Sequence, residues 1–218
     1  SLGLVGSEMC IRDRGNAALC AGISALEKGA TVKILEKANE YLAGGNTKYT
    51  AGAMRFVYNN GEELKPLLKD PYDPKLEKTN FGQYTKEKFS EDLLNFNDGK
   101  PLTIEQKTLI NESYETMKWL ASHDVKFEPI YQRQSFEKDG KFVFWGGLTL
   151  ASKNEGVGLF DQELDAFKKL GGEIEYETPV TELLREEGKI TGVKTKDNNF
   201  IADAVILASG GFEADKEM

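Results

Sequence analysis

The sequence is poor in the residues that build metal centres and disulfide frameworks. Its 218 residues include one histidine, His123, and two cysteines, Cys10 and Cys20. The cysteines form no Cys-x-x-Cys pair and no cluster with the histidine, so the sequence predicts no metal site. Two thiols without further partners are typical of a reducing compartment. We therefore expect free thiols and a cytoplasmic protein.

Long hydrophobic runs and a basic surface are also missing. No run approaches the roughly 18 apolar residues of a membrane span, so we expect no transmembrane segment. The mildly apolar start at residues 1–6 is followed at once by Glu8 and Arg12, so we expect no secretory signal in these residues. Lys and Arg number 28 against 36 Asp and Glu, for a net charge of -8. Such a surface repels a phosphate backbone, so we expect no nucleic-acid partner.

A helix followed closely by a strand opens the interpretable part of the chain. Residues 16–28 carry small and apolar side chains at helical spacing, and Gly29 is placed to end that helix. Residues 31–36 are apolar and β-branched, which predicts a strand that ends at Glu36. This order is half of a βαβ unit and favours the α/β class with a parallel sheet.

The middle of the chain predicts helices and short extended segments. Residues 55–84 are polar, contain three prolines and show little periodicity, so we expect an irregular connection. Helices are predicted over 85–95 and from 101 or 102 to 122, the second with a capping box at Thr103 and Gln106. Ile110, Met117 and Leu120 share one face of that helix. Short strands are predicted at 125–127 and 141–145, after a turn at 139–140.

The last part of the chain predicts a return to the sheet. We expect a helix over 161–170, a strand over 173–176 and a meander of strands at 180–186, 190–196 and 199–202. Residues 204–208 are continuously apolar, which predicts a strand buried on both faces. That strand runs into Ser209, Gly210 and Gly211.

The start of the first helix resembles a phosphate-binding turn. A dinucleotide fold places G-x-G-x-x-G/A between a strand and a helix, where glycines allow close approach to a pyrophosphate. Gly15 and Ala18 fit the second and third positions, but Asp13 stands at the first. Residues 8–14 look like a poor buried strand, so we expect residues 1–14 to be a non-native leader. On its own this motif fits a simple helix start equally well.

Three further features support a dinucleotide site. Glu36 lies at a strand end about twenty residues after Gly15, where a carboxylate accepts hydrogen bonds from ribose hydroxyls. The loop Gly44–Thr47 carries two glycines that let backbone lie against a ligand. The strand entering Gly210 adds a carboxyl end, where ligands of open α/β sheets gather. Each feature alone also fits an exposed glutamate or an ordinary turn; the combination favours a nucleotide site.

Together these segments resemble the fumarate reductase/succinate dehydrogenase flavoprotein family. The resemblance rests on residues 15–18, 34–37, 44–47, 180 and 204–212, and it extends over residues 15–218. Within the family, residues 210–214 and Trp145-Gly146-Gly147 most resemble the tricarballylate dehydrogenase branch. The chain is therefore similar to an N-terminal fragment of such a flavoprotein.

The resemblance implies a Rossmann-like FAD-binding domain with a parallel sheet and a three-stranded meander, joined to the start of an α+β capping domain. It assigns residues 15–54 to the first part of the FAD-binding domain, 55–150 to the capping or substrate domain and 151–218 to the second, incomplete part of the FAD-binding domain. The cofactor-binding residues that it implies are Gly15, Asn16, Ala17, Ala18, Glu36, Lys37, Gly44, Gly45, Asn46, Thr47, Gly52, Ala53, Val180, Ala208, Ser209, Gly210 and Gly211. The histidine that tethers FAD in succinate dehydrogenases would fall near residues 46–48, where there is none, so non-covalent FAD is expected.

The resemblance also implies the chemistry. Members transfer a hydride between flavin and a carbon–carbon bond of a small molecule that bears carboxylates, with an electron donor or acceptor that the sequence does not identify. Their catalytic residues match positions beyond Met218, so we expect this chain to be inactive by itself. His123 fits a polar helix end better than a catalytic role. Two alternatives stay open: a flavin dehydrogenase acting on enones or ketosteroids, and a non-catalytic nucleotide-binding module.

Overall fold

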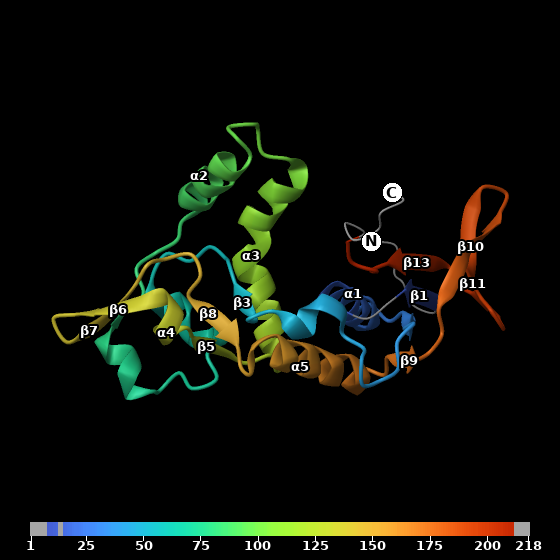
Figure 1. Cartoon of the computed structure of the whole chain (residues 1–218), viewed down its shortest axis with the longest axis horizontal. Coiled ribbons are helices and arrows are strands. Elements are labelled where there is room, and N and C mark those ends of the chain that lie inside the picture. The colour runs from blue at the N-terminus through green and yellow to red at the C-terminus, as the bar shows by residue number, and fades with distance from the viewer. Residues whose placement is uncertain (1–7, 13–14, 212–218) are drawn as a thin grey trace. The chain divides into compact units, whose positions relative to one another are not determined.

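The computed structural model describes residues 8–12 and 15–211, and these form two compact units (Figure 1). We call Ser1–Tyr49 together with Phe160–Met218 the sheet unit, and Thr50–Leu159 the aromatic unit. The sequence placed the divisions after residues 54 and 150. The second division differs because one uninterrupted helix, α5 (Glu155–Lys169), runs through it.

A parallel sheet of four strands forms the centre of the sheet unit. The strands are β1 (Glu8–Arg12), β2 (Thr31–Leu35), β9 (Glu173–Glu175) and β13 (Ala204–Leu207), in the order β13-β1-β2-β9. Every neighbouring pair is parallel. Helix α1 (Asn16–Glu27) connects β1 to β2, and Gly29 ends it with a φ of 83°. The predicted α/β class with a parallel sheet is therefore confirmed.

The expectation that no strand precedes the phosphate turn is wrong. β1 is a central strand that pairs with β13 on one side and β2 on the other. Cys10 and Ile11 are only 3% and 0% exposed, so a short apolar centre satisfies the core even between charged residues. The backbone ladders on both sides supply the remaining stabilisation. Asp13 lies outside the described residues, and the non-native origin of residues 1–14 stays a prediction.

Two further elements of the sheet unit differ from the sequence expectation. Helix α5 begins at Glu155, six residues before the predicted start at 161, although Gly156 and Gly158 are poor helix formers. A side chain at Gly158 would overlap the backbone of Lys153, so the first turn needs glycine there. Strand β13 was expected to be buried on both faces. Its residues are half-buried and Leu207 is exposed, because β13 is the edge of the sheet among the described residues.

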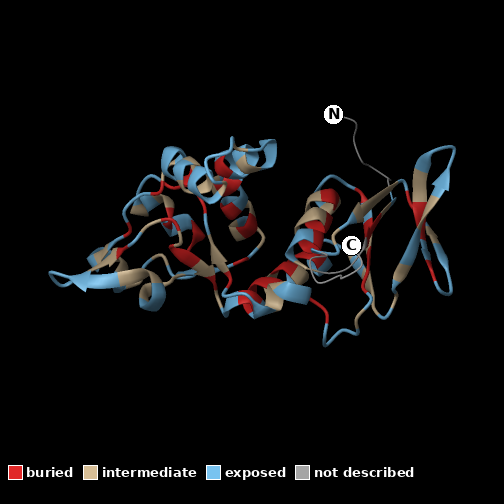
Figure 2. Cartoon of the chain, turned by 45° about the horizontal axis from the view of Figure 1, so that its top comes forward, coloured by how far each residue is buried: buried red, intermediate tan, exposed pale blue. Residues whose placement is uncertain are grey.

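The predicted meander is confirmed. It consists of β10 (Val180–Glu186), β11 (Lys189–Thr195) and β12 (Asn199–Ile201), paired antiparallel in that order. Val193 is buried and packs with Cys10 and Leu35 in one cluster, so the meander shares a core with the parallel sheet. In Figure 2 the tip of the β10–β11 hairpin is exposed.

The aromatic unit contains two long helices, a one-turn helix and two small sheets, and α5 begins in it. Helices α2 (Lys86–Phe96) and α3 (Ile104–Ser122) match their predictions, and α3 begins with the expected capping box between Thr103 and Gln106. The strands are short: β3 (Ala53–Met54), β8 (Leu150–Ser152) and β5 (Phe127–Pro129) form one sheet, and β4 (Thr79–Asn80), β7 (Lys141–Phe144) and β6 (Ser135–Lys138) the other. The helix α4 (Tyr131–Gln134) and the 3-10 turns 61–63, 65–67 and 74–78 fill the connections.

Aromatic side chains and buried hydroxyls hold this unit together. Phe56, Tyr58, Phe89 and Phe127 are at most 2% exposed. The Tyr58 hydroxyl donates to the carbonyl of Phe81 at 2.9 Å and lies 2.7 Å from the hydroxyl of Thr149. Each buried hydroxyl therefore has a partner, as burial requires.

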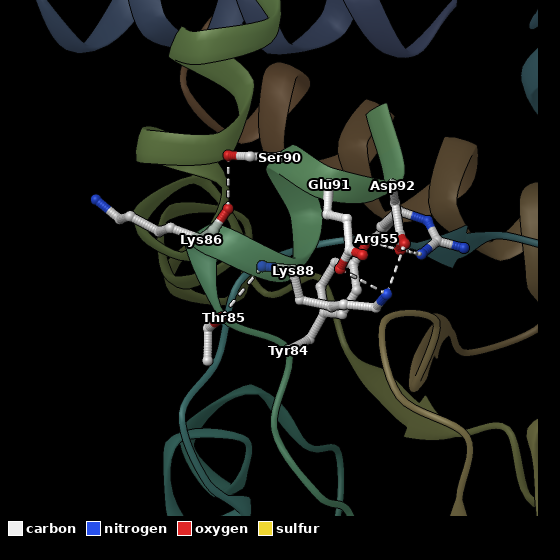
Figure 3. A network of polar contacts seen from close by, with 8 residues as sticks. All are labelled: Arg55, Tyr84, Thr85, Lys86, Lys88, Ser90, Glu91 and Asp92. Carbon is white, nitrogen blue, oxygen red and sulfur yellow. Dashed lines mark hydrogen bonds and ion pairs between the residues drawn. The ribbon is translucent and has the colours of Figure 1, made fainter. Parts of the chain in front are cut away.

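A polar network anchors α2 to the segment after β3 (Figure 3). Arg55 donates to the Tyr84 hydroxyl at 2.9 Å, and that hydroxyl donates to Asp92 at 2.6 Å. Lys88 pairs with Asp92 at 3.2 Å. A side chain on Gly147 would lie 2.6 Å from the Arg55 guanidinium, so glycine there makes room for the network.

Candidate functional site

A cavity of about 530 Å³ lies in the sheet unit, where the carboxyl ends of β2 and β13 meet the start of α1. Ligand sites of proteins commonly have volumes in this range. The residues around the cavity come from four separate segments: Gly15, Asn16, Ala17, Glu36, Lys37, Ala38, Leu42, Gly44, Gly45, Asn46, Thr47, Ala208, Ser209, Gly210 and Gly211. The structure therefore brings most of the predicted cofactor residues to one place.

The start of α1 meets the glycine loop directly. The N–H of Asn16 donates to the Thr47 hydroxyl at 3.0 Å. A Cβ on Gly15 would lie 3.3 Å from that same hydroxyl, so a larger residue would push the two segments apart. The first turn of a helix has N–H groups without intrahelical acceptors and carries the positive end of the helix dipole. This corner of the cavity is suited to a phosphate.

Glu36 is a buried carboxylate fixed at the end of β2. Its side chain accepts the N–H of Ala38 at 2.8 Å, and its own N–H donates to the carbonyl of Glu175 at 2.9 Å. Only 4% of the residue is exposed, and it lines the cavity. A held carboxylate at this position can accept hydrogen bonds from ribose hydroxyls.

Gly45 and Gly210 leave open space beside the cavity. Their φ angles are 50° and 73°, and a Cβ built on either would meet no atom within 4 Å. Glycine tolerates these left-handed conformations, and its lack of a side chain lets a flat or anionic group contact the backbone. Gly44 differs, because a Cβ there would collide with Lys48. The residues present therefore fit a dinucleotide.

Four predicted cofactor residues lie away from the cavity lining. Ala18 is fully buried under the turn, and Val180 begins β10 in the meander. Gly52 and Ala53 belong to the aromatic unit, where Ala53 pairs with Ala151 in the β3–β8 ladder. A Cβ on Gly52 would overlap the Ser152 hydroxyl and the backbone of Glu155, which gives that glycine a packing reason of its own.

Two residues of the cavity lining were not predicted from the sequence. Ala38 and Leu42 follow the strand end at Glu36, in the run that leads to the glycine loop. Their position between two predicted contacts was the available signal. His123, in contrast, ends α3 in the aromatic unit, with Nδ1 2.8 Å from the carbonyl of Trp119 and its ring in a tilted contact with the Trp119 ring. These contacts agree with the helix-end role that the sequence favoured.

A buried carboxylate beneath α1 was also missed. Glu163 of α5 has no exposed surface, and its carboxyl oxygen accepts a hydrogen bond from the Cys20 thiol at 3.7 Å. With its nitrogen turned toward Glu163, the side-chain amide of Asn16 donates to both carboxylate oxygens, at 2.5 and 3.3 Å. Burial raises the pKa of Glu163 to about 8, and the Cys20 hydrogen bond opposes that rise. Burial also raises the pKa of the Cys20 thiol.

The described residues contain no cluster of histidine, cysteine and acidic groups that could hold a metal ion. None of the described helices combines the length and the apolar character that a membrane crossing requires.

A parallel sheet with a glycine turn at a helix start and an acid at the next strand end defines a dinucleotide-binding protein. Comparison with family models narrows this class. The model described as FAD dependent oxidoreductase matches residues 15–217, so the chain belongs to that family. FAD, the cofactor predicted from the sequence, is the cofactor of this family.

Curated relatives agree with this assignment. A urocanate reductase of Eggerthella lenta is 28% identical over 222 residues, which cover 94% of this chain and 31% of that protein. A fumarate reductase (cytochrome) of Shewanella frigidimarina is 26% identical over 213 residues, covering 93% of this chain and 33% of that protein. The chain thus spans about a third of the length of these relatives. These two names support the predicted flavoprotein family and leave the tricarballylate branch as a prediction.

A solved structure supports the fold. The open conformation of a flavocytochrome c3 fumarate reductase matches with a TM-score of 0.67 at 20% identity, covering 98% of this chain and 35% of that one. The likeness confirms the predicted Rossmann-like α/β architecture of a flavoprotein.

Proposed function

We propose that this chain supplies the FAD-binding part of an oxidoreductase that transfers a hydride between flavin and a carbon–carbon bond. The observation that carries the proposal is the cavity at the carboxyl ends of β2 and β13, whose lining combines the helix start, Glu36 and the open glycines. In the proposed arrangement, the α1 turn takes the diphosphate and Glu36 takes the adenosine ribose. Bound FAD would supply the hydride chemistry, and these residues would orient it.

The substrate that we propose is a small molecule bearing carboxylates. The matched relatives are named for the reduction of urocanate and of fumarate, both unsaturated carboxylates, which supports this class. Within it we propose the tricarballylate dehydrogenase-like branch, on the similarity around Trp145, Gly146 and Gly147 and in residues 210–214. Residues 212–214 lie outside the described part of the chain. We keep non-covalent FAD, an unidentified electron partner and a cytoplasmic location as parts of the proposal.

The cofactor part of the proposal is tested by comparing FAD with FMN, which lacks the adenosine. Flavin fluorescence titrations should give tighter binding of FAD than of FMN. Glu36→Gln should lower the affinity for FAD about tenfold or more, which is the scale of a lost charge-assisted hydrogen bond. The affinity for FMN should not change. Glu40→Gln is the matched control, because Glu40 is an exposed acid on the following loop whose carboxylate pairs only loosely with Lys168 at 3.9 Å. Equal affinity for FAD and FMN would refute the assigned site.

The reaction is tested with the full-length protein. Its flavin is reduced with dithionite and mixed with fumarate, urocanate, an unsaturated tricarboxylate or an enone steroid. Reoxidation by one of the carboxylates alone supports the proposal. Reoxidation by the steroid alone would favour the enone alternative, and FAD binding without reoxidation would favour a non-catalytic module.

A further inference from the structure

The side chain of Lys48 lies against the glycine loop of the cavity. Lys48 belongs to the 3-10 helix Gly45–Tyr49, which contains most of that loop. Gly44 has a φ of 115°, and a Cβ built on it would lie 2.9–3.0 Å from three carbons of the Lys48 side chain. The lysine stem is therefore packed on the backbone of Gly44, in a contact that only glycine allows without displacing the lysine.

The ammonium group of Lys48 connects the loop to two further segments. It donates a hydrogen bond to the carbonyl of Tyr41 at 3.3 Å, seven residues earlier in the chain. It also lies 4.6 Å from the centre of the Phe160 ring, within the range of a cation–π contact. Phe160 is 1% exposed and belongs to α5, so this contact ties the ammonium group to the core of the sheet unit.

The loop that Lys48 contacts supplies one wall of the cavity. The four residues of Gly44–Thr47 all belong to the cavity lining, whereas Lys48 lies outside it. Thr47 accepts the N–H of Asn16 at 3.0 Å, so the loop is also joined to the start of α1, where the phosphate corner lies. An effect of Lys48 on a bound ligand therefore has to pass through the backbone of this loop.

We propose that Lys48 is a positioning residue that fixes the backbone of the glycine loop for the diphosphate of a bound dinucleotide. The proposal rests on the proposed FAD site, and it assigns Lys48 no contact with the cofactor. Gly44 and Gly45 both have positive φ, and glycine loses more conformational freedom on ordering than any other residue. A loop that is fixed before binding does not lose this freedom when the ligand arrives, so its affinity for phosphate groups is higher.

The first test measures the loop without any ligand. Lys48→Met keeps an apolar stem against Gly44 and removes the hydrogen bond and the cation. In NMR relaxation of the labelled chain, the backbone amides of Gly44, Gly45 and Asn46 should be as ordered as the rest of the sheet unit in the wild type. They should become mobile on the nanosecond timescale in Lys48→Met and stay ordered in Lys48→Arg, which keeps a donor and a cation.

The matched control for the relaxation measurement is Lys28→Met. Lys28 is an exposed lysine at the C-terminal end of α1, and its replacement should leave the loop unchanged. Equal order of the loop amides in the wild type and in Lys48→Met would overturn the proposal, whatever the affinity for FAD.

The second test compares ADP, which carries the diphosphate, with adenosine, which does not. Lys48→Met should lower the affinity for ADP and FAD about fivefold, the scale of one charged hydrogen bond and one cation–π contact acting indirectly, and leave adenosine unchanged. Lys48→Arg should restore most of the loss, and Lys28→Met should bind like the wild type. An equal loss for ADP and adenosine would overturn the proposal, because it would show a general disturbance of the sheet unit.

Salt separates positioning from simple attraction between the lysine and the phosphates. The ratio of ADP affinities between the wild type and Lys48→Met should persist at about 0.5 M salt, because a fixed backbone is not screened. A ratio that falls to one at high salt would overturn the positioning role. Failure of the wild type to bind ADP and FAD would refute the proposed function instead, and the relaxation measurement would still decide whether Lys48 fixes the loop.

Discussion

The sheet unit and the aromatic unit reach stability by different means. The sheet unit is built on a parallel backbone ladder, with close contacts that only glycine permits, such as Gly22 against the ring of Phe167. The aromatic unit has strands of two to four residues and depends on large rings and buried hydroxyls, such as Phe127 and Tyr58. The architecture of the sheet unit produces periodic patterns and glycine turns in the local sequence. The architecture of the aromatic unit depends on contacts between residues that are distant in the sequence.

The chain carries a natural probe for each unit. Both tryptophans, Trp119 and Trp145, lie in the aromatic unit, and both cysteines, Cys10 and Cys20, lie in the sheet unit. Burial raises the pKa of Cys10 to about 11 and also raises that of Cys20, so both thiols should react slowly while the sheet unit is folded. Tryptophan fluorescence and thiol labelling during urea unfolding therefore report the two units separately.

The largest expected effect comes from Phe127→Ala in the aromatic unit. Phe127 is fully buried, and its truncation leaves a cavity, so we expect a loss of about 3–5 kcal/mol in the free energy of unfolding. The tryptophan midpoint should fall to lower urea. Tyr72→Ala is the control, because Tyr72 is 90% exposed and its loss should change little.

This variant also tests the separation of the units. If thiol exposure keeps its midpoint while the tryptophan transition moves, the two architectures unfold independently. An equal shift of both transitions would break the comparison, and the units would then form one cooperative structure.

The sequence predicted the sheet unit well because its signals are local. Helical spacing over 16–28, the meander and the glycine-rich turns each lie within one short segment. The prediction for β1 was wrong because the apolar centre of this strand is too short to be recognised beside Glu8 and Arg12. Its central position follows from pairing with β13 and β2, which the local sequence does not show. In the aromatic unit the two long helices were predicted, while strands such as β3 and β4 are too short to show a period.

The candidate site divides in the same way. Glu36 and the glycines were predicted because ligands gather at strand ends, and that rule needs only the order of elements. Glu163 was missed because its partner Cys20 is 143 residues away, and nothing in a helical pattern distinguishes a buried carboxylate from an exposed one. A buried carboxyl whose hydrogen-bond partner is distant in the sequence is identified only from the coordinates.

The next effect concerns stability of the sheet unit at high pH. The carboxyl of Glu163 has a pKa of about 8 in the folded chain and an ordinary value near 4.5, so the folded state holds its proton longer. Its stabilisation is complete below about pH 4.5 and is lost as pH rises through about 8. Glu163→Gln removes this loss, so at about pH 9 we expect it to exceed the wild type by on the order of 3 kcal/mol.

Thiol labelling in urea at about pH 6 and about pH 9 measures this difference, with Asp161→Asn as the surface control. The gap between Glu163→Gln and the wild type should widen with pH. If the difference in unfolding free energy between Glu163→Gln and the wild type did not change with pH, the ionisation of Glu163 would not destabilise the sheet unit.

The smallest expected effect concerns the capping box of α3, a feature of the aromatic unit that the sequence predicted. The Thr103 hydroxyl accepts the N–H of Gln106 at 3.2 Å, and the Gln106 side chain accepts the N–H of Thr103 at 3.1 Å. Thr103→Ala removes the first bond and should cost about 1 kcal/mol, seen as a lower tryptophan midpoint. Thr116→Ala is the matched control, because its hydroxyl bonds only to the preceding turn of the same helix, at Glu112. Equal losses in both variants would show that α3 is held by its packed face of Ile110, Met117 and Leu120 and not by its cap. In that case the stability of α3 would depend on contacts between distant residues, as in the rest of the aromatic unit, although its start was predicted from the local sequence.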